Sequence, residues 1–165
     1  MRPPILDRLT EGQILIGDGA TGTYLQMSGL EPGGCPEELN LSQPELVQEM
    51  ASAYFKSGSD IVLTNSFGGT KFMLGKYGYA DRVTEFNYLA AQHASSQTPN
   101  GKYTLGSVGP TGEFLEPIGE VTTSEMLDAF IEQVTALEEG GAHGILVETM
   151  SAIEETILAI RAVKE

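Results

Sequence analysis

Four short apolar runs divide the chain, and a segment with helical periodicity follows each of them. The runs are ILI at 14–16, DIVLTNSFGG at 60–69, YTLGSVGPTG at 103–112 and HGILVETM at 143–150. They are nearly continuous rather than alternating, as expected of parallel strands that helices cover. The pattern therefore predicts four successive β/α units, (βα)4, with the helices outside a parallel sheet.

The segments between the runs carry signals for helix starts and ends. Three pairs have the spacing of a capping box: Ser42 with Glu45, Thr122 with Glu125, and Ser151 with Glu154. Gly58 and Gly140-Gly141 are placed to end helices. Two apolar stripes are expected to face the core: Leu127, Phe130, Val134 and Leu137 in one helix, and Ile153, Ile157 and Ile160 in the next. The glycine- and proline-rich stretch after Gly22 is expected to be mostly loop.

Length and composition restrict the function classes. The chain has 165 residues and a net charge of −14, and such a surface repels phosphate backbones, so a nucleic-acid partner is not expected. No apolar run approaches the roughly 20 residues that span a bilayer. The first twelve residues lack the apolar core of a signal peptide, so we expect a cytoplasmic protein without a membrane partner. Cys35 is the only cysteine, which excludes an internal disulfide.

GDGATG, residues 17–22, matches the glycine spacing of dinucleotide-binding sites. That motif requires a helix at its third glycine and an acid at the end of the second strand. The segment after Gly22 is predicted to be loop, and the second strand ends in Thr64-Asn65. Asp18 also places a negative charge where a pyrophosphate would lie. The dinucleotide interpretation is therefore the weakest, and a site for a small amine or thiol fits better.

Polar residues follow each predicted strand, and in a β/α fold these positions meet at one end of the sheet. They are Asp18 after the first strand, Thr64, Asn65 and Ser66 after the second, GPTGE after the third, and Glu148 and Thr149 after the fourth. Structural alternatives remain open at this point. Asp18 could cap the turn that follows it, Thr64 and Asn65 could cap a short helix, and Glu148 could cap the last helix.

With these positions laid out, the sequence resembles the homocysteine-binding domain of homocysteine S-methyltransferases, most closely the cobalamin-dependent methionine synthase type, and also betaine–homocysteine methyltransferase. Five stretches carry the resemblance, in order: DGATGTYLQ (18–26), PEELNLSQPELV (36–47), SGSDIVLTNSFGGTKFMLGKYG (57–78), GSVGPTGE (106–113) and GILVETM (144–150). The resemblance implies a TIM (β/α)8 barrel, of which residues 1–165 form the N-terminal half. The first and fourth strands are then expected to have unpaired edges.

The resemblance also implies the reaction, methyl transfer to the thiol of homocysteine to give methionine, and the residues that bind the substrate. Glu148 is expected to bind the amino group, with Asp18, Gly19 and Ala20 at the floor of the site. The second tip is expected to line the pocket through Thr64, Asn65, Ser66 and Phe67. Gly109, Pro110 and Thr111 are expected to shape the rim.

The chain departs from the family at the metal. In the family, zinc activates the thiol through a cysteine after the sixth strand and two adjacent cysteines after the eighth, and none of these is present. Cys35 matches none of them, and His93 and His143 lie away from the predicted strand tips, so no metal ligand or catalytic residue is assigned. Zinc is expected only for the complete domain, with methylcobalamin among the candidate methyl donors.

Two hypotheses follow. In the favoured one, the chain supplies the amino-acid-recognition half of a methyltransferase, is inactive alone, and has homocysteine, the C-terminal half and a cobalamin-binding module as partners. In the other, a half-barrel pairs with a second copy as a binding or oligomerisation module without catalysis. The sequence does not identify the methyl donor.

Overall fold

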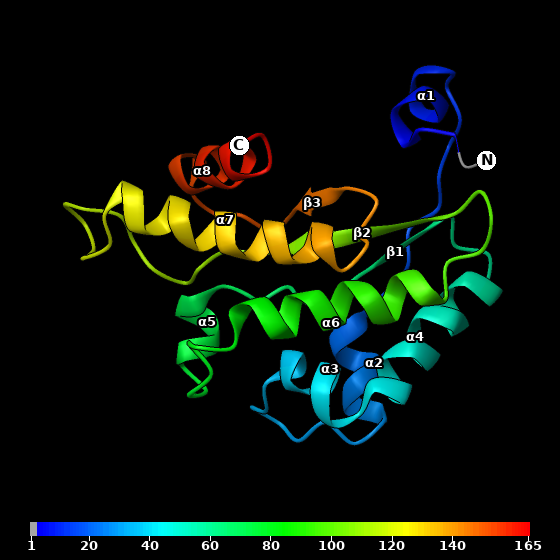
Figure 1. Ribbon diagram of the computed structural model, residues 1–165, viewed down its shortest axis with the longest axis horizontal. Coiled ribbons are helices and arrows are strands. Elements are labelled where there is room, and N and C mark those ends of the chain that lie inside the picture. The colour runs from blue at the N-terminus through cyan, green and yellow to red at the C-terminus, as the bar shows by residue number, and fades with distance from the viewer. Residues whose placement is uncertain (1–2) are drawn as a thin grey trace.

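The computed structural model describes residues 3–165 and shows a parallel three-stranded sheet with helices outside it (Figure 1). The strands lie in the order β1 (Ile61–Leu63), β2 (Tyr103–Val108) and β3 (Ile145–Val147). In the parallel register, Leu63 pairs with Leu105, and Val108 pairs with Val147. Parallel pairing with a crossover between each two strands confirms the predicted α/β class.

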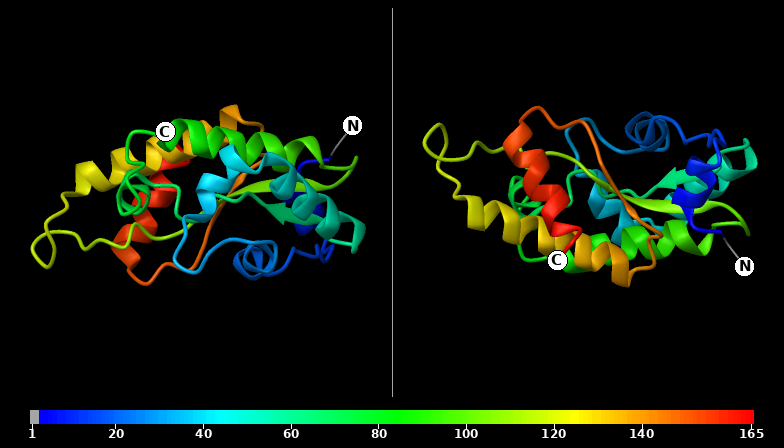
Figure 2. Two further views of the ribbon diagram at one scale, coloured as in Figure 1. Left: turned by 90° about the horizontal axis from the view of Figure 1, so that it is seen from below. Right: turned by 90° about the horizontal axis from the view of Figure 1, so that it is seen from above.

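Long helices cover the strands in chain order. The helices are α1 (Ile5–Thr10), α2 (Thr21–Met27), the 3₁₀ helix η1 (Pro36–Glu38), α3 (Leu39–Ser42), α4 (Pro44–Lys56), α5 (Lys71–Gly75), α6 (Val83–Ser96), α7 (Thr123–Glu139) and α8 (Ile153–Ala162). Helix α4 packs on β1, α6 and α7 pack on β2, and α8 packs on β3. Figures 1 and 2 show α6 and α7 side by side. This succession is the arrangement expected for part of a β/α barrel.

The predicted first strand at 14–16 is not formed, so the prediction of four strands is wrong by one. The carbonyl of Ile16 accepts hydrogen bonds from the amides of Asp60 and Ile61 (2.7 and 3.0 Å). The amide of Ile16 donates to Asp60 Oδ2 (3.0 Å). The segment thus lies beside the start of β1 but pairs through one residue. Ile14 remains 86% exposed, because nothing among the described residues covers its other side.

The central strand β2 organises the core. All of its residues are buried, and the largest cluster joins Val108 to Phe130 and Leu137 on α7 and to Leu158 on α8. The predicted stripe on α7 is therefore confirmed. The stripe predicted for α8 is wrong, since Ile153, Ile157 and Ile160 are 74%, 52% and 43% exposed. Leu158, Ala159 and Ala162 make the buried face of α8 instead.

The helix-start predictions had mixed outcomes. The capping box of Thr122 and Glu125 is confirmed, with both backbone amides bonded to the other residue's side chain. The other two are wrong. Helix α4 begins after Gln43 without a side-chain cap, and the Ser42 hydroxyl donates to Glu38. Helix α8 begins after Ala152, also without a side-chain cap. At α4, proline at the first position fixes the start without a cap.

Helix α1 holds the amino-terminal end of the sheet. The Arg8 guanidinium donates to the carbonyl of Gly101 (3.0 Å), lies 4.0 Å from Asp60 Oδ1 and stacks over the Tyr103 ring. The Tyr103 hydroxyl donates to the carbonyl of Pro3 (2.8 Å). These contacts lie where β1 and β2 begin, at the end of the sheet away from the predicted site. Within residues 3–165, no helix has the length and apolar character to cross a membrane.

Candidate functional site

A cavity of about 350 Å³ lies at the carboxyl ends of the strands and gathers the predicted substrate-binding residues except Asp18. Its lining includes residues from five segments of the chain: Gly19 to Gly22, Pro36 and Glu37, Leu63 to Phe67, Ser107, and Glu148. These segments are far apart in sequence, and parallel strand order brings their ends together. The fold therefore brings the ends of these segments together at one place, as predicted, although the GPTGE run does not line the cavity.

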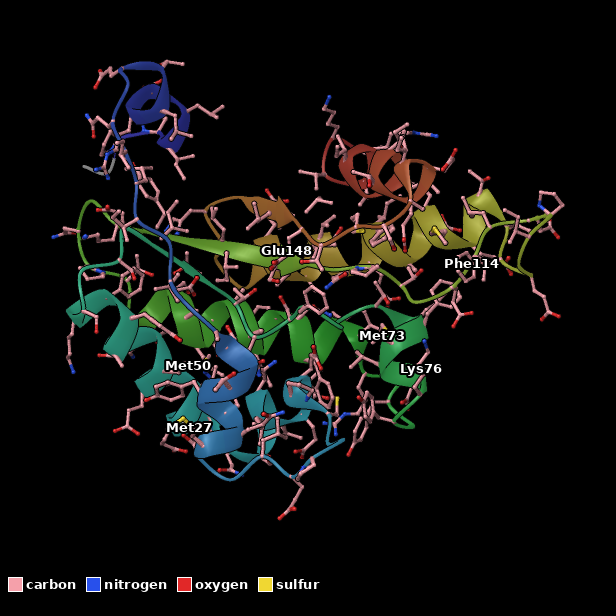
Figure 3. The ribbon with its side chains drawn as sticks, turned by 180° about the vertical axis from the view of Figure 1, so that it is seen from behind. Met27, Met50, Met73, Lys76, Phe114 and Glu148 are labelled. Carbon is pink, nitrogen blue, oxygen red and sulfur yellow. The ribbon has the colours of Figure 1, made fainter. Side chains whose placement is uncertain are left out.

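Glu148 follows β3 directly and lies near the middle of the molecule (Figure 3). Its Oε1 accepts a hydrogen bond from the Ser107 hydroxyl at the end of β2 (2.7 Å). Its amide donates to the carbonyl of Val108, which extends the parallel ladder by one residue. Thr149 then has a φ of 57°, a left-handed conformation rare for a β-branched residue. The chain thus turns sharply after Glu148, and Glu148 does not cap α8, because that helix has no side-chain cap.

Asp18 does not line the cavity but is hydrogen-bonded to Leu63, which does. Its Oδ2 accepts a hydrogen bond from the Leu63 amide (2.7 Å), so Asp18 joins the 13–20 segment to β1 and does not cap α2. Burial raises the pKa of Asp18, and the nearby charge of Glu148 adds to the rise. A second carboxylate close to Asp18 makes this region electronegative, which favours a positively charged group beside it.

The loop after β1 forms the opposite wall through Thr64, Asn65, Ser66 and Phe67. The Thr64 and Ser66 hydroxyls bond to each other (2.5 Å), and Ser66 also donates to the carbonyl of Ser107 (2.8 Å). Asn65 donates to the carbonyl of Pro36 (2.7 Å). Thr70 caps helix α5, which begins at Lys71, so Thr64 and Asn65 do not cap it. The side chains of Thr64, Asn65 and Ser66 instead form hydrogen bonds that stabilise this wall of the cavity.

Glu37 is a cavity residue that the sequence analysis missed. It is 4% exposed, and its Oε1 accepts a hydrogen bond from the Gly68 amide (2.7 Å). Burial raises its pKa. The only local signal, a glutamate between Pro36 and Glu38, looks like an exposed acidic turn. Its burial depends on the contact with Gly68, which sequence spacing does not reveal.

Helix α2 corrects the prediction of loop after Gly22. Leu25 is fully buried against Val47 and Met50 of α4, and this tertiary contact outweighs the glycines around it. One condition of the dinucleotide motif is thus met, since Gly22 lies in the first turn of a helix. The second strand still ends without an acid, and the Asp18 carboxylate still lies within the motif, so the motif remains a poor match for a pyrophosphate.

The predicted rim residues Gly109, Pro110 and Thr111 do not line this cavity. The Gly109 amide donates to the carbonyl of Phe67 (3.0 Å), behind the wall. Thr111 is fully buried, and both its amide and its hydroxyl donate to Glu155 Oε1 (2.7 and 2.6 Å). A larger cavity, about 550 Å³, lies between residues 113–118 and α8 and contains none of the predicted substrate-binding residues. Phe114, labelled in Figure 3, lies in that outer region.

The described residues do not fit a zinc site. No group of three His, Cys, Asp or Glu side chains in residues 3–165 is placed to hold a metal ion. Cys35 is buried and its thiol bonds to Glu37, while burial and the charge of Glu37 raise the pKa of Cys35 to about 12. A thiolate is thereby disfavoured. His93 is buried in α6 against the carbonyl of Asn40 (2.8 Å), and His143 contacts Thr104 at the amino-terminal end of the sheet.

Comparison with solved structures supports the fold. The structure resembles the homocysteine methyltransferase MmuM from Escherichia coli in its oxidised form, with a TM-score of 0.80 and 21% identity. It also resembles the metallated form, with a TM-score of 0.79 and 20% identity. The alignments cover 99% and 96% of this chain and 62% of each MmuM chain. The fold is therefore part of the one that MmuM adopts.

Sequence comparison assigns the family. Methionine synthases of Mycobacterium leprae and Mycobacterium tuberculosis are 35% and 36% identical to this chain over 159 residues. Each alignment covers 88% of this chain but only 13% of the longer protein. The homocysteine S-methyltransferase family model matches residues 15–165. The chain belongs to the homocysteine S-methyltransferase family.

Proposed function

We propose that this chain binds homocysteine in the 350 Å³ cavity and forms the N-terminal, amino-acid-recognition half of a homocysteine S-methyltransferase barrel. The observation that carries the proposal is the placement of Glu148 at the cavity beside Asp18. Neither carboxylate has a lysine, arginine or histidine partner among the residues that line the cavity. An amino acid's ammonium group supplies the missing positive charge.

The proposed binding mode uses both walls. The carboxylate of Glu148, oriented by Ser107, receives the ammonium group of homocysteine. Gly22 leaves the backbone of the facing segment open, since no atom lies within 4 Å of the position a Cβ would occupy. The loop from Thr64 to Phe67 forms the opposite side of the cavity. Methyl transfer in the full family domain would require the thiolate of homocysteine, which a bound zinc ion would stabilise. The described residues form no zinc site.

Isothermal titration calorimetry with reduced L-homocysteine tests the proposal. Glu148→Gln keeps the shape of the side chain but removes its charge, and we expect a loss of about tenfold or more in affinity. Glu154→Gln, at an exposed position of α8, is the matched control and should bind as the original chain does. Failure of the unaltered chain to bind, or equal affinity of Glu148→Gln, would falsify the proposal.

Methyl transfer itself is expected to need residues beyond those described. We propose that the chain alone binds no stoichiometric zinc and transfers no methyl group from methylcobalamin. A version extended through the family's cysteine-rich segment should do both. Elemental analysis and a methionine assay distinguish the two versions. Turnover with stoichiometric zinc in the 165-residue chain would contradict the assignment of roles to the two halves.

One observation favours the alternative of a self-associating half-barrel. Exposed apolar side chains lie on Ile153, Ile157 and Ile160 of α8, beside the free edge of β3. A net charge of −14 on each copy opposes that pairing. Sedimentation at low and high salt tests it, because pairing should strengthen as salt screens the repulsion. A monomer at both salt concentrations rules the alternative out.

A further inference from the structure

The cavity wall formed by residues 64–69 is held from behind by four buried polar side chains. Asn40 of α3 donates to the carbonyl of Asn65 (2.9 Å), and Asn87 of α6 donates to the carbonyl of Gly69 (2.8 Å). Gln133 of α7 donates to the carbonyl of Ser66 (2.8 Å). Glu37 accepts from the amide of Gly68 (2.7 Å). Successive peptide groups of the wall are thus fixed by elements that approach from three sides.

Gln133 does not line the cavity, and it is the one of these four side chains that keeps a buried polar atom without a hydrogen bond among the described residues. It is fully buried on the face of α7 that also carries Phe130, Val134 and Leu137. Its Nε2 donates to the carbonyl of Ser66 and to Asn87 Oδ1 (3.3 Å), so it links the wall to a second wall-holding residue. Its Oε1 accepts no hydrogen bond from any residue in 3–165.

An unpaired buried acceptor lowers the stability of a fold, and an apolar side chain of the same size would avoid that cost. Position 133 therefore keeps a glutamine where core packing alone favours a residue such as methionine. Both bonds of the Gln133 amide serve the wall. The side chain of Gln133 leaves one oxygen unpaired, but its two hydrogen bonds fix the positions of Ser66 and Asn87.

Gly69 supports the same interpretation. A Cβ added there would lie 2.6 Å from Gln133 Nε2 and would also overlap the Asn87 amide. Gly69 is not in the left-handed region, so its backbone does not itself require glycine. The absence of a side chain lets the two amides reach the wall. The glycine and the two amides thus form one unit.

We propose that Gln133 is a positioning residue for the substrate cavity: from α7 it fixes the Ser66 carbonyl and the Asn87 amide, and thereby the shape of the wall that faces Glu148. The proposal rests on the proposed function for the identity of the ligand, homocysteine. The effect of Gln133 on the wall does not depend on the proposed function, because that effect can be measured without a ligand.

The experiment compares three variants in the 165-residue chain. Gln133→Met removes the hydrogen bonds at similar volume, and Gly69→Ala displaces the side-chain amides of Gln133 and Asn87 while both residues keep their identity. Gln92→Met, on the exposed face of α6, is the matched control. Three measurements are made on each: urea unfolding, hydrogen exchange of the Gly68 and Gly69 amides, and homocysteine affinity by calorimetry.

For Gln133→Met we expect an unfolding midpoint equal to or above that of the original chain, with exchange of the two amides about tenfold faster. Homocysteine affinity should fall by about tenfold. Gly69→Ala should show the same local change, and it provides the test if Gln133→Met does not fold. Gln92→Met should change none of the three.

Two results overturn the proposal. One is an unchanged exchange rate in Gln133→Met and Gly69→Ala, which would mean that the wall holds its shape without the amides. The other is a loss of stability that accounts for the whole change in exchange, which would make Gln133 an ordinary core residue. If the original chain binds no homocysteine, the proposed function fails, and the exchange and unfolding data still decide the role of Gln133.

Discussion

The region around β2 and the region around α8 have similarly apolar sequences but very different surroundings. β2 has a strand on each side and helices α6 and α7 against it, and all of its residues are buried. β3 has one neighbouring strand, and Leu146 at its centre is 39% exposed. Ile153 of α8 is 74% exposed. Apolar periodicity thus identifies which residues need a cover, whereas the number of neighbouring elements decides whether they have one.

The strongest way to test this difference is a deletion in the centre. Phe130→Ala removes a fully buried ring from the α7 face that packs on β2. We expect a loss of about 3–5 kcal/mol in the free energy of unfolding, because a cavity remains where the ring was. Urea unfolding followed by circular dichroism measures it. A loss below about 1 kcal/mol would show that the centre is no better packed than the edge.

The buried carboxyl group of Glu37 makes the stability of the fold depend on pH. Burial raises its pKa in the folded chain, so the folded state keeps a proton that the unfolded state releases above its ordinary value of 4.5. The stabilisation is complete below that value and is lost as pH rises through the folded pKa, at up to about 1.4 kcal/mol per pH unit.

Glu37→Gln should abolish this decline, since the amide does not titrate but still accepts from the Gly68 amide. Urea unfolding between pH 5 and 8 compares the two chains. We expect the curve of the unaltered chain to fall relative to that of Glu37→Gln as pH rises. Parallel curves over this range would contradict a raised pKa at Glu37.

A smaller effect is expected at the start of α7, where Thr122 is partly exposed. Thr122→Ala removes the side-chain cap that accepts from the Glu125 amide (3.2 Å). We expect a loss of about 1 kcal/mol in the free energy of unfolding. Thr122→Ser retains the hydroxyl and should restore most of it. If alanine and serine behave alike, the cap has no role in stability.

The smallest effect is expected at the edge. Ile157→Ser replaces a side chain that is 52% exposed on α8. The free energy of unfolding should change by no more than about 0.5 kcal/mol, because little apolar surface is uncovered. Any self-association seen by sedimentation should weaken. A loss as large as that of Phe130→Ala would mean that the α8 face is covered in solution.

Much of the fold followed from local patterns. Three of the four apolar runs became strands, and the Thr122–Glu125 capping box formed because both partners lie within one helical turn. The run at 14–16 did not form a strand because strand formation depends on a partner along its length, and only Ile16 has one. Leu25 shows the converse case, where burial by α4 made a helix among glycines.

The candidate site was predictable where it depends on strand order. Asn65 and Glu148 follow strands, and parallel topology brings them to one end. Asp18 follows an apolar run that forms no strand, and its hydrogen bond to the Leu63 amide holds it there. Glu37 and Gln133 were missed for a physical reason: their partners, Gly68 and Ser66, are 31 and 67 residues away in the sequence. The contacts with Gly68 and Ser66 are with backbone atoms, which carry no residue-type signal. Their role as parts of a homocysteine site remains a prediction.

Helix α1 and the end of α8 have a consequence for how the molecule can be handled. Arg8 ties the amino-terminal helix to the loop at Gly101, before β2. At the other terminus, Val163 and Glu165 lie beside His143 to Ile145, where β3 begins. Helix α1 and the end of α8 therefore lie near the amino-terminal ends of the strands, whereas the cavity lies at their carboxyl ends. An affinity tag, a surface anchor or a fluorescent label can be attached at either end without blocking the entry of a ligand.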